Sequence, residues 1–313
     1  MKYFWIFLLF PALIWAQNTN GITGVRDYSY NNQDALKNDL KNYPGLTLAV
    51  HSSKLPYEET AGIVYKTVGN RTLELDYLGP KTKKICPTIL FIHGGGWRTG
   101  DKRQHLELAK SLVDKGFRVF LVAYRLSTEA LYPAAMQDVH EALNFLFQQA
   151  QKYRIDTKHI SVAGFSAGGQ MAALLGSTWD EPLYGIHSKD YKIHAVIDID
   201  GILAYIHPES GEGDDRQKLS AATLYFGYSK AENPTIWNEA SALYHVSSLD
   251  PPVLFINSAV DRMHAGREDF RKKMNAFSIK TQVVSFENAP HSFLLYSPWM
   301  EKVAQEMANF LNQ

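Results

Sequence analysis

Residues 160–169, ISVAGFSAGG, constrain the fold more than any other part of this 313-residue chain. A strand-like apolar run ends at Ala163, and the segment GFSAG at 164–168 leads at once into an alanine-rich stretch. Gly-x-Ser-x-Gly between a strand and a helix predicts a sharp turn with Ser166 at its apex. Glycine is needed at 164 and 168 because a side chain there would collide where strand and helix cross. The segment therefore predicts a strand–turn–helix unit with an exposed serine.

Most of the chain alternates short apolar runs with longer amphipathic stretches. The runs are rich in Val and Ile and too short for buried helices, so we expect buried strands. We place strands at 88–92, 118–123, 159–163, 195–199, 252–257 and 281–286, and helices at 104–115, 134–153 and 167–176. Gly69-Asn70 separates two β-rich runs and predicts an opening antiparallel hairpin. The pattern predicts an α/β fold, a mostly parallel central sheet with helices on both faces.

The N-terminus has the pattern of an export signal. Lys2 precedes a short apolar run over 3–15, and Ala16 is the small residue expected before a cleavage site. The run is shorter than the about 20 apolar residues of a membrane span. We therefore expect a signal peptide over 1–16, with an uncleaved anchor as the alternative, and no integral membrane span after cleavage. A polar arm over 17–60 and one catalytic domain over 61–313 follow.

Composition excludes several classes of partner. The 32 basic residues balance the 32 acidic ones, so the chain lacks the basic excess of nucleic-acid binders. No His or Cys cluster has the spacing of metal ligands, and we expect neither a metal nor an organic cofactor. Cys86 is the only cysteine, which excludes an intrachain disulfide and fits a bacterial periplasmic or secreted protein.

Residues 201–245 interrupt the alternation with acidic and aromatic side chains. Insertions of this length in α/β domains often build walls or lids over a site. The acidic residues indicate a solvated loop rather than a metal site.

A second motif, TILFIHGGGW at 88–97, places three glycines directly after an expected strand. A glycine run lets backbone N–H groups approach a small anion, because no Cβ blocks them. We expect Gly95 and Gly96 to form an oxyanion hole with the N–H of Ala167, the residue after the serine. Gly94 then shapes the turn, and His93 is structural.

A serine nucleophile needs a base and an acid on nearby loops. His291 follows the last expected strand, and the order serine, acid, histidine along the chain singles it out over its rivals, His207, His245 and His264. Asp261 follows the preceding strand and is our expected acid. Asp198 and Asp200, which end an earlier strand, are the alternatives.

These motifs together resemble the α/β-hydrolase superfamily, and within it bacterial esterases and lipases marked by HGGGW and GFSAGG. The likeness covers about residue 62 to the C-terminus, and the terminal PHSF is similar to exported feruloyl and acetylxylan esterases. The resemblance implies a serine esterase acting on acetyl or feruloyl esters of polysaccharides or oligosaccharides, without a cofactor. Trp97 and residues 201–245 are the expected substrate contacts.

Three alternatives stay open. A general carboxylesterase or lipase for simple acyl esters would use the same triad with a different pocket. A peptidase of the prolyl oligopeptidase type normally carries a large accessory domain, for which this chain is too short. A non-catalytic binding protein on the same fold is the third alternative, because fold does not fix function.

Overall fold

The computed structural model describes residues 17–185 and 191–313. The expected signal peptide over 1–16 lies outside the described residues. The domain boundaries expected from the sequence stay predictions, although the first strand of the hairpin, β2 (Tyr57–Val68), already begins inside the expected arm.

An eight-stranded sheet with the order β2-β3-β5-β4-β6-β7-β8-β9 forms the centre of the molecule. Its further strands are β3 (Arg71–Pro80), β4 (Cys86–Ile92), β5 (Arg118–Val122), β6 (Ile155–Phe165), β7 (Val196–Ile199), β8 (Val253–Asn257) and β9 (Thr281–Ser285). β2 and β3 pair antiparallel as the expected hairpin, and β3 pairs antiparallel with β5. All pairs from β5 to β9 are parallel. The predicted α/β class and the mostly parallel sheet are confirmed.

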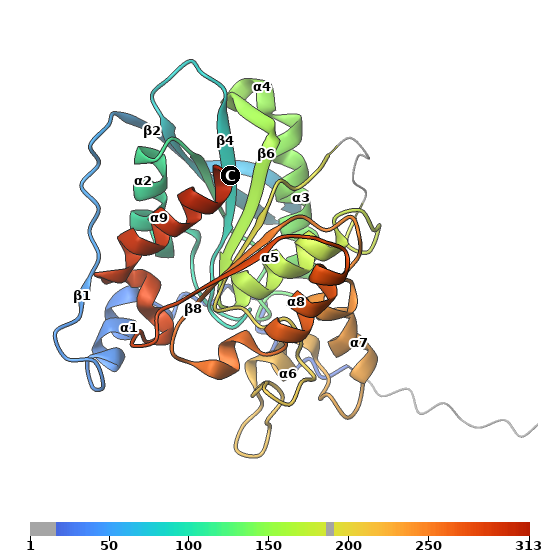
Figure 1. Cartoon of the computed structure of the whole chain (residues 1–313). Helices are drawn as coiled ribbons and strands as arrows, with labels where there is room; N and C mark the ends of the chain where they lie inside the picture. The colour runs from blue at the N-terminus through green and yellow to red at the C-terminus, as the bar shows by residue number, and fades with distance from the viewer. Residues whose placement is uncertain (1–16, 186–190) are drawn as a thin grey trace, which may run out of the picture.

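Helices cover both faces of this sheet (Figure 1). One face carries α2 (Leu106–Asp114) and α9 (Trp299–Leu311), and the other carries α3 (Ala134–Gln148), α5 (Ala167–Thr178) and α8 (Arg267–Ala276). Shorter helices are α1 (Asn32–Asp39), α4 (Ala150–Tyr153), α6 (Ala221–Phe226) and α7 (Pro234–Glu239), and β1 (Thr47–Leu48) pairs with β10 (Tyr296–Ser297). α6 and α7 lie beyond the carboxyl ends of the parallel strands, at the bottom of Figure 1.

Alternate side chains of the parallel strands pack into two separate hydrophobic cores, one on each face of the sheet. On β4, Leu90 and Ile92 pack into the core under α3 and α5, whereas Ile89 and Phe91 pack into the core under α2 and α9. Successive strand residues point to opposite faces, so a strand covered on both sides must be apolar throughout. This explains why the sequence shows continuous apolar runs rather than alternating ones.

The arm that precedes the sheet lies along the surface and is tied to distant parts of the chain. The Asn18 N–H donates to the Gly227 carbonyl at 2.7 Å, and the Tyr296 hydroxyl donates to Asp39 at 2.8 Å. The sequence showed little periodicity here, yet the arm contains α1 and β1. Both are short elements that depend on contacts with the domain.

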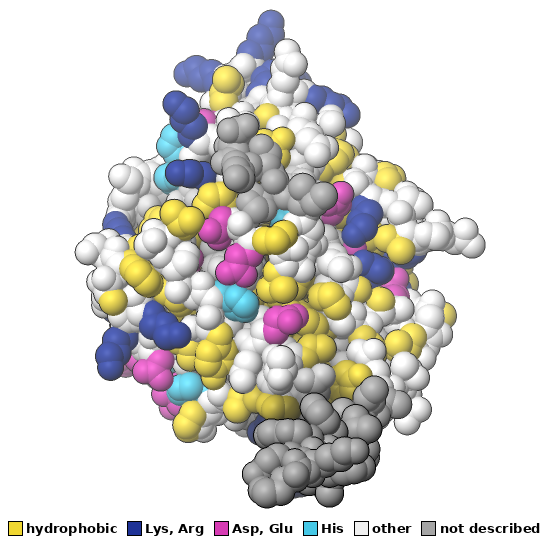
Figure 2. Space-filling model, turned by 90° about the vertical axis from the view of Figure 1, so that its right-hand side faces the viewer, with side chains coloured by type: hydrophobic (Ala, Val, Ile, Leu, Met, Phe, Trp, Pro, Cys, Tyr) yellow, Lys and Arg dark blue, Asp and Glu magenta, His cyan; other side chains and the backbone are white. Residues whose placement is uncertain are grey.

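On the face shown in Figure 2, hydrophobic side chains lie singly or in small groups between charged and polar ones. No helix in the described part of the chain is long and apolar enough to span a membrane.

A buried carboxyl group in the loop before β8 gives a stability prediction. Burial raises the pKa of Asp250 from 3.8 to about 6, although Ser247 donates to its Oδ1 at 2.8 Å. The ionised form is thus disfavoured in the folded state, and stability is lost as the pH rises from about 4 to about 6. Asp250→Asn should stabilise the protein at pH 7.5 by at most about 3 kcal/mol. Thermal unfolding should show this gain shrinking towards pH 4.5; an equal gain at both pH values would contradict it.

Candidate active site

The predicted turn at Ser166 is present between β6 and α5. Ser166 has φ 57° and ψ −121°, a strained conformation that lifts its side chain out of the turn. A Cβ on Gly164 would lie 2.0 Å from the Gly168 carbonyl oxygen, and one on Gly168 would lie 2.1 Å from that of Ile92. Both glycines are therefore required by the close approach of strand and helix, as expected.

His291 meets this serine from the other side. It follows β9 and opens the 3-10 helix η4 (His291–Leu295). Its Nε2 lies 2.9 Å from the Ser166 Oγ, and its ring stacks on Phe165 with the centroids 4.9 Å apart. The structure thus brings together the two side chains that the sequence indicated as nucleophile and base.

The expected acid is corrected by the structure. Asp200 Oδ2, not Asp261, lies 2.9 Å from His291 Nδ1. Asp200 follows β7, is fully buried, and accepts the Ser258 N–H on Oδ1 at 2.7 Å. Asp261 is exposed at the start of η3 (Asp261–His264) and lines a separate cavity with His264 and others.

Backbone geometry explains the correction. Asp200 has φ 51°, so the chain reverses immediately after β7 and the carboxylate turns towards His291. β7 also pairs directly with β6, the strand that carries Ser166. After β8 the chain continues through Ser258 and two more residues before it reaches Asp261, whose side chain lines a different cavity from His291.

The neighbouring carboxyl group of Asp198 has a different environment. Its Oδ1 accepts the Gly201 N–H at 2.8 Å, while its Oδ2 has no hydrogen-bond partner among the described residues. Burial raises the pKa of Asp198 well above its usual range, so its neutral form is favoured. Asp198 therefore supports the turn that carries Asp200 and does not contact His291.

The glycine loop after β4 lies beside the serine. Gly96 and Ala167 line the same cavity as Ser166, and no hydrogen bond within the described chain uses either N–H. Gly95 is not among the lining residues; its carbonyl accepts the N–H groups of Arg98 and Thr99, and its φ is 121°. Two of the three expected oxyanion donors are thus placed at the cavity, and Gly95 forms the turn behind them.

His93 holds this loop and does not reach the cavity. Its Nδ1 lies 2.7 Å from the Gly94 carbonyl oxygen, and its ring stacks on Tyr124 with centroids 4.5 Å apart. Burial lowers the pKa of His93 to about 4, so it is neutral and its Nδ1 donates to the carbonyl.

The cavity at the serine has a volume of about 210 Å³. Trp97 forms one wall and is held rigidly: its Nε1 donates to Gln170 Oε1 at 3.0 Å, and its ring stacks on Tyr225 at 13°. The other lining residues are Gly96, Ser166, Ala167, Ile202, Glu212, Ala221, Arg262, Met263 and His291. The segment 201–245 thus supplies part of the wall.

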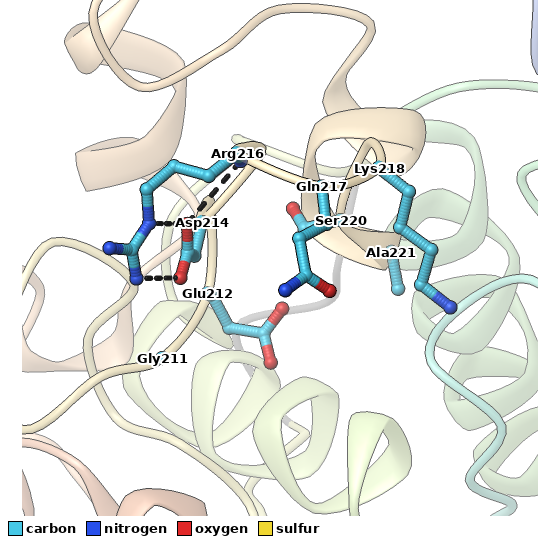
Figure 3. A pocket seen from close by; sticks show the side chains of 8 residues that line it. All are labelled: Gly211, Glu212, Asp214, Arg216, Gln217, Lys218, Ser220 and Ala221. Atoms are coloured by element: carbon cyan, nitrogen blue, oxygen red, sulfur yellow. Dashed lines mark hydrogen bonds and ion pairs between the residues drawn. The ribbon is translucent and has the colours of Figure 1, made fainter.

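A second, larger cavity of about 580 Å³ adjoins it and shares Glu212 and Ala221 (Figure 3). We call it the polar trough; its lining residues are Gly211, Glu212, Asp214, Arg216, Gln217, Lys218, Ser220 and Ala221. In Figure 3 the side chains of Glu212 and Gln217 extend towards the middle of the trough, and the Lys218 ammonium points away from them. Across the described residues, no cluster of three His, Cys, Asp or Glu side chains could hold a metal ion.

The strand order, the serine turn and the Ser–His–Asp chain define an α/β-hydrolase. The chain belongs to the BD-FAE family, whose sequence profile matches residues 75–267, more than half of its length.

Curated relatives and solved structures agree with this class. The esterase LipC of Mycobacterium tuberculosis is 27% identical over 246 residues, which are 74% of this chain and 59% of LipC. Carboxylesterase NlhH of the same organism is 35% identical over 100 residues, about a third of each chain. The chain thus spans little more than half of LipC, and its match to NlhH is local.

Among solved structures, a truncated carbohydrate esterase from gut microbiota superimposes with a TM-score of 0.69 at 20% identity, covering 84% of this chain and 98% of that one. A bifunctional GH43-CE protein of Bacteroides eggerthii gives 0.66 at 23% identity, covering 81% of this chain and 38% of that one. These likenesses show the α/β-hydrolase fold, and the comparisons together support the expected class, a carboxylic ester hydrolase.

Proposed function

We propose that this protein is a serine esterase that removes small acyl groups, above all acetyl, from carbohydrate esters. The observation that carries the proposal is the continuous hydrogen-bonded chain Ser166–His291–Asp200, with both contacts at 2.9 Å, at the wall of a small cavity. An ester carbonyl in this cavity would meet a nucleophile, its base and two backbone donors together.

The reaction proceeds in two halves. His291 Nε2 takes the proton of Ser166 as Oγ attacks the ester carbonyl, and the N–H groups of Gly96 and Ala167 stabilise the oxyanion. The C–O bond to the alcohol breaks, and His291 returns the proton to that oxygen. Water, deprotonated by His291, then attacks the acyl-enzyme; the bond between the acyl carbon and Ser166 Oγ breaks, His291 returns the proton to Oγ, and the acid is released. Asp200 holds the imidazole in the correct tautomer and stabilises the imidazolium in both halves.

The shape and polarity of the site favour a small acyl group on a polar alcohol. The cavity of about 210 Å³ is smaller than the roughly 300–1,000 Å³ that takes a drug-sized ligand. The adjoining polar trough is more than twice as large and is lined by charged and amide side chains. We therefore assign the acyl group to the cavity and the sugar to the trough.

A serine-reactive fluorophosphonate and a substrate panel test the proposal. The wild-type protein should be labelled at Ser166 and should release acetate from acetylated xylan or galacturonan, as measured by an acetate assay. Feruloylated and methyl-esterified polysaccharides and long-chain nitrophenyl esters complete the panel. Labelling with turnover of long-chain esters alone would favour a lipase, and absence of labelling would favour a binding protein.

The size of the cavity predicts a steep dependence on acyl length. Nitrophenyl acetate should be hydrolysed faster than the butanoate, because each added methylene that does not fit changes the barrier by about 1–3 kcal/mol. Ile202→Ala should enlarge the cavity and move the preference towards butanoate, as measured by kcat/KM for the two esters. A profile in the wild type that rises with chain length would contradict the proposed cavity.

Export through a signal peptide over 1–16 is also a proposal. N-terminal sequencing of protein recovered from the medium or periplasm of an expressing bacterium should find a chain that begins near Gln17. Recovery of the intact N-terminus from the membrane fraction would instead indicate an anchor.

A further inference from the structure

Arg262 places a positive charge in the wall of the catalytic cavity. It is the second residue of η3, and it lines the same cavity as Ser166 and His291. Its side chain is 56% exposed, so the guanidinium faces the opening rather than the core. The proposed mechanism transfers the acetyl group to water without using the guanidinium of Arg262.

The guanidinium of Arg262 makes one long ion pair and no hydrogen bond among the described residues. Its one charged partner among the described residues is Glu212, with Nη1 and Oε1 3.7 Å apart, which is too long for a hydrogen bond. Burial raises the pKa of Glu212, and the positive charge of Arg262 acts in the opposite direction. The remaining guanidinium N–H groups of Arg262 therefore face the opening of the cavity.

Arg216 in the adjoining polar trough, unlike Arg262, is hydrogen-bonded to a carboxylate of the protein. Its Nε donates to Asp214 Oδ1 at 2.7 Å and its Nη2 to Oδ2 at 2.6 Å, so the pair is bidentate (Figure 3). A carboxylate thus already occupies the fork of Arg216. The fork of Arg262, on the boundary between cavity and trough beside Glu212, has no such occupant.

We infer that Arg262 binds a carboxylate of the substrate, so that the esterified sugar is an acidic one, a uronic acid residue. This assignment rests on the proposed esterase function. A planar guanidinium matches a carboxylate with two parallel hydrogen bonds, and no other arginine or lysine among the described residues lines the catalytic cavity. A sugar esterified at a ring hydroxyl carries its own carboxylate only a few bonds away, within reach of a cation in the same cavity as the nucleophile.

Three purified full-length proteins test the inference: wild type, Arg262→Gln and Arg271→Gln. Arg271 lies on α8, where it contacts Glu268 and Thr281, so its substitution is a matched loss of one guanidinium outside the site. The substrates are O-acetylated polygalacturonate, O-acetylated xylan and nitrophenyl acetate.

For the acidic polymer, Arg262→Gln should lower kcat/KM by about 10- to 100-fold, the usual worth of a charge-assisted hydrogen-bonded contact. The loss on nitrophenyl acetate, which has no carboxylate, should be much smaller, and thermal unfolding verifies that the variant is folded. Arg271→Gln should match the wild type on every substrate. Salt at 0.5 M should slow the wild type on the acidic polymer and should affect Arg262→Gln much less.

Equal losses on acidic and neutral polymers, or a wild type that prefers xylan, would overturn the inference while leaving the esterase intact. Failure of all three proteins on nitrophenyl acetate, with no labelling of Ser166, would instead overturn the esterase proposal and the inference with it.

Discussion

Asp200→Asn is expected to lower kcat on acetyl esters by about 10⁴-fold, with little change in KM. An amide at this position can donate to His291 Nδ1, which favours the tautomer that carries its proton on Nε2 and cannot accept from Ser166. In serine proteases the corresponding change costs about this factor. The two contacts of 2.9 Å on either side of the imidazole make the same loss the expected result here.

Asp261→Asn is the matched control, because it makes the same change at the residue that the sequence favoured. Asp261 is exposed and lies in a different cavity, so kcat should stay within about twofold of the wild type. Steady-state kinetics on nitrophenyl acetate, with thermal unfolding of each variant, separate loss of activity from loss of folding. A large loss in Asp261→Asn with an active Asp200→Asn would refute the assignment.

The sequence predicted the sheet and much of the site because both depend on local patterns. The apolar runs mark the parallel strands, and the glycines at 164 and 168 mark a turn where any side chain would clash. His291 follows from its place after the last strand. These features can be recognised in the sequence without knowing how the loops pack against one another.

The acid could not be chosen from the same patterns. Asp200 and Asp261 both follow a parallel strand, both reach the same edge of the sheet, and both fit the order serine, acid, histidine. The choice depends on the positive φ at Asp200 and on the direction of the loop after β8, which are properties of the folded backbone. The order of the strands was a usable signal. β7 pairs directly with β6, so an acid that follows β7 is one strand away from the serine, whereas an acid that follows β8 is two strands away.

Glu212 and Arg262 were missed for a related reason. They are 50 residues apart in the chain and meet only because the segment 201–245 folds back over η3. The expectation that this segment forms a wall rested on its length alone. Nothing in its composition indicated which of its acidic residues lines the cavity that contains the serine. Trp97 was named from its motif, but its stacking on Tyr225 depends on α6.

Ser166→Ala is expected to lower kcat by about 10⁶-fold and to abolish fluorophosphonate labelling, because no other group in the cavity can form the acyl-enzyme. Alanine keeps the backbone turn and most of the side-chain volume, so folding and substrate binding should persist. Acetate release at high enzyme concentration measures the residual rate, and the labelling gel measures the nucleophile separately.

The double variant Ser166→Ala/Asp200→Asn tests whether these residues act as one unit. If Asp200 acts only through His291 on Ser166, the second substitution should change the residual rate by less than about threefold, although it costs about 10⁴-fold in the wild-type background. Residual turnover in Ser166→Ala comes from the oxyanion donors and substrate positioning, which Asp200 does not contact. A further large loss in the double variant would show that Asp200 and His291 also activate water without the serine, so that the three residues do not act only as one unit.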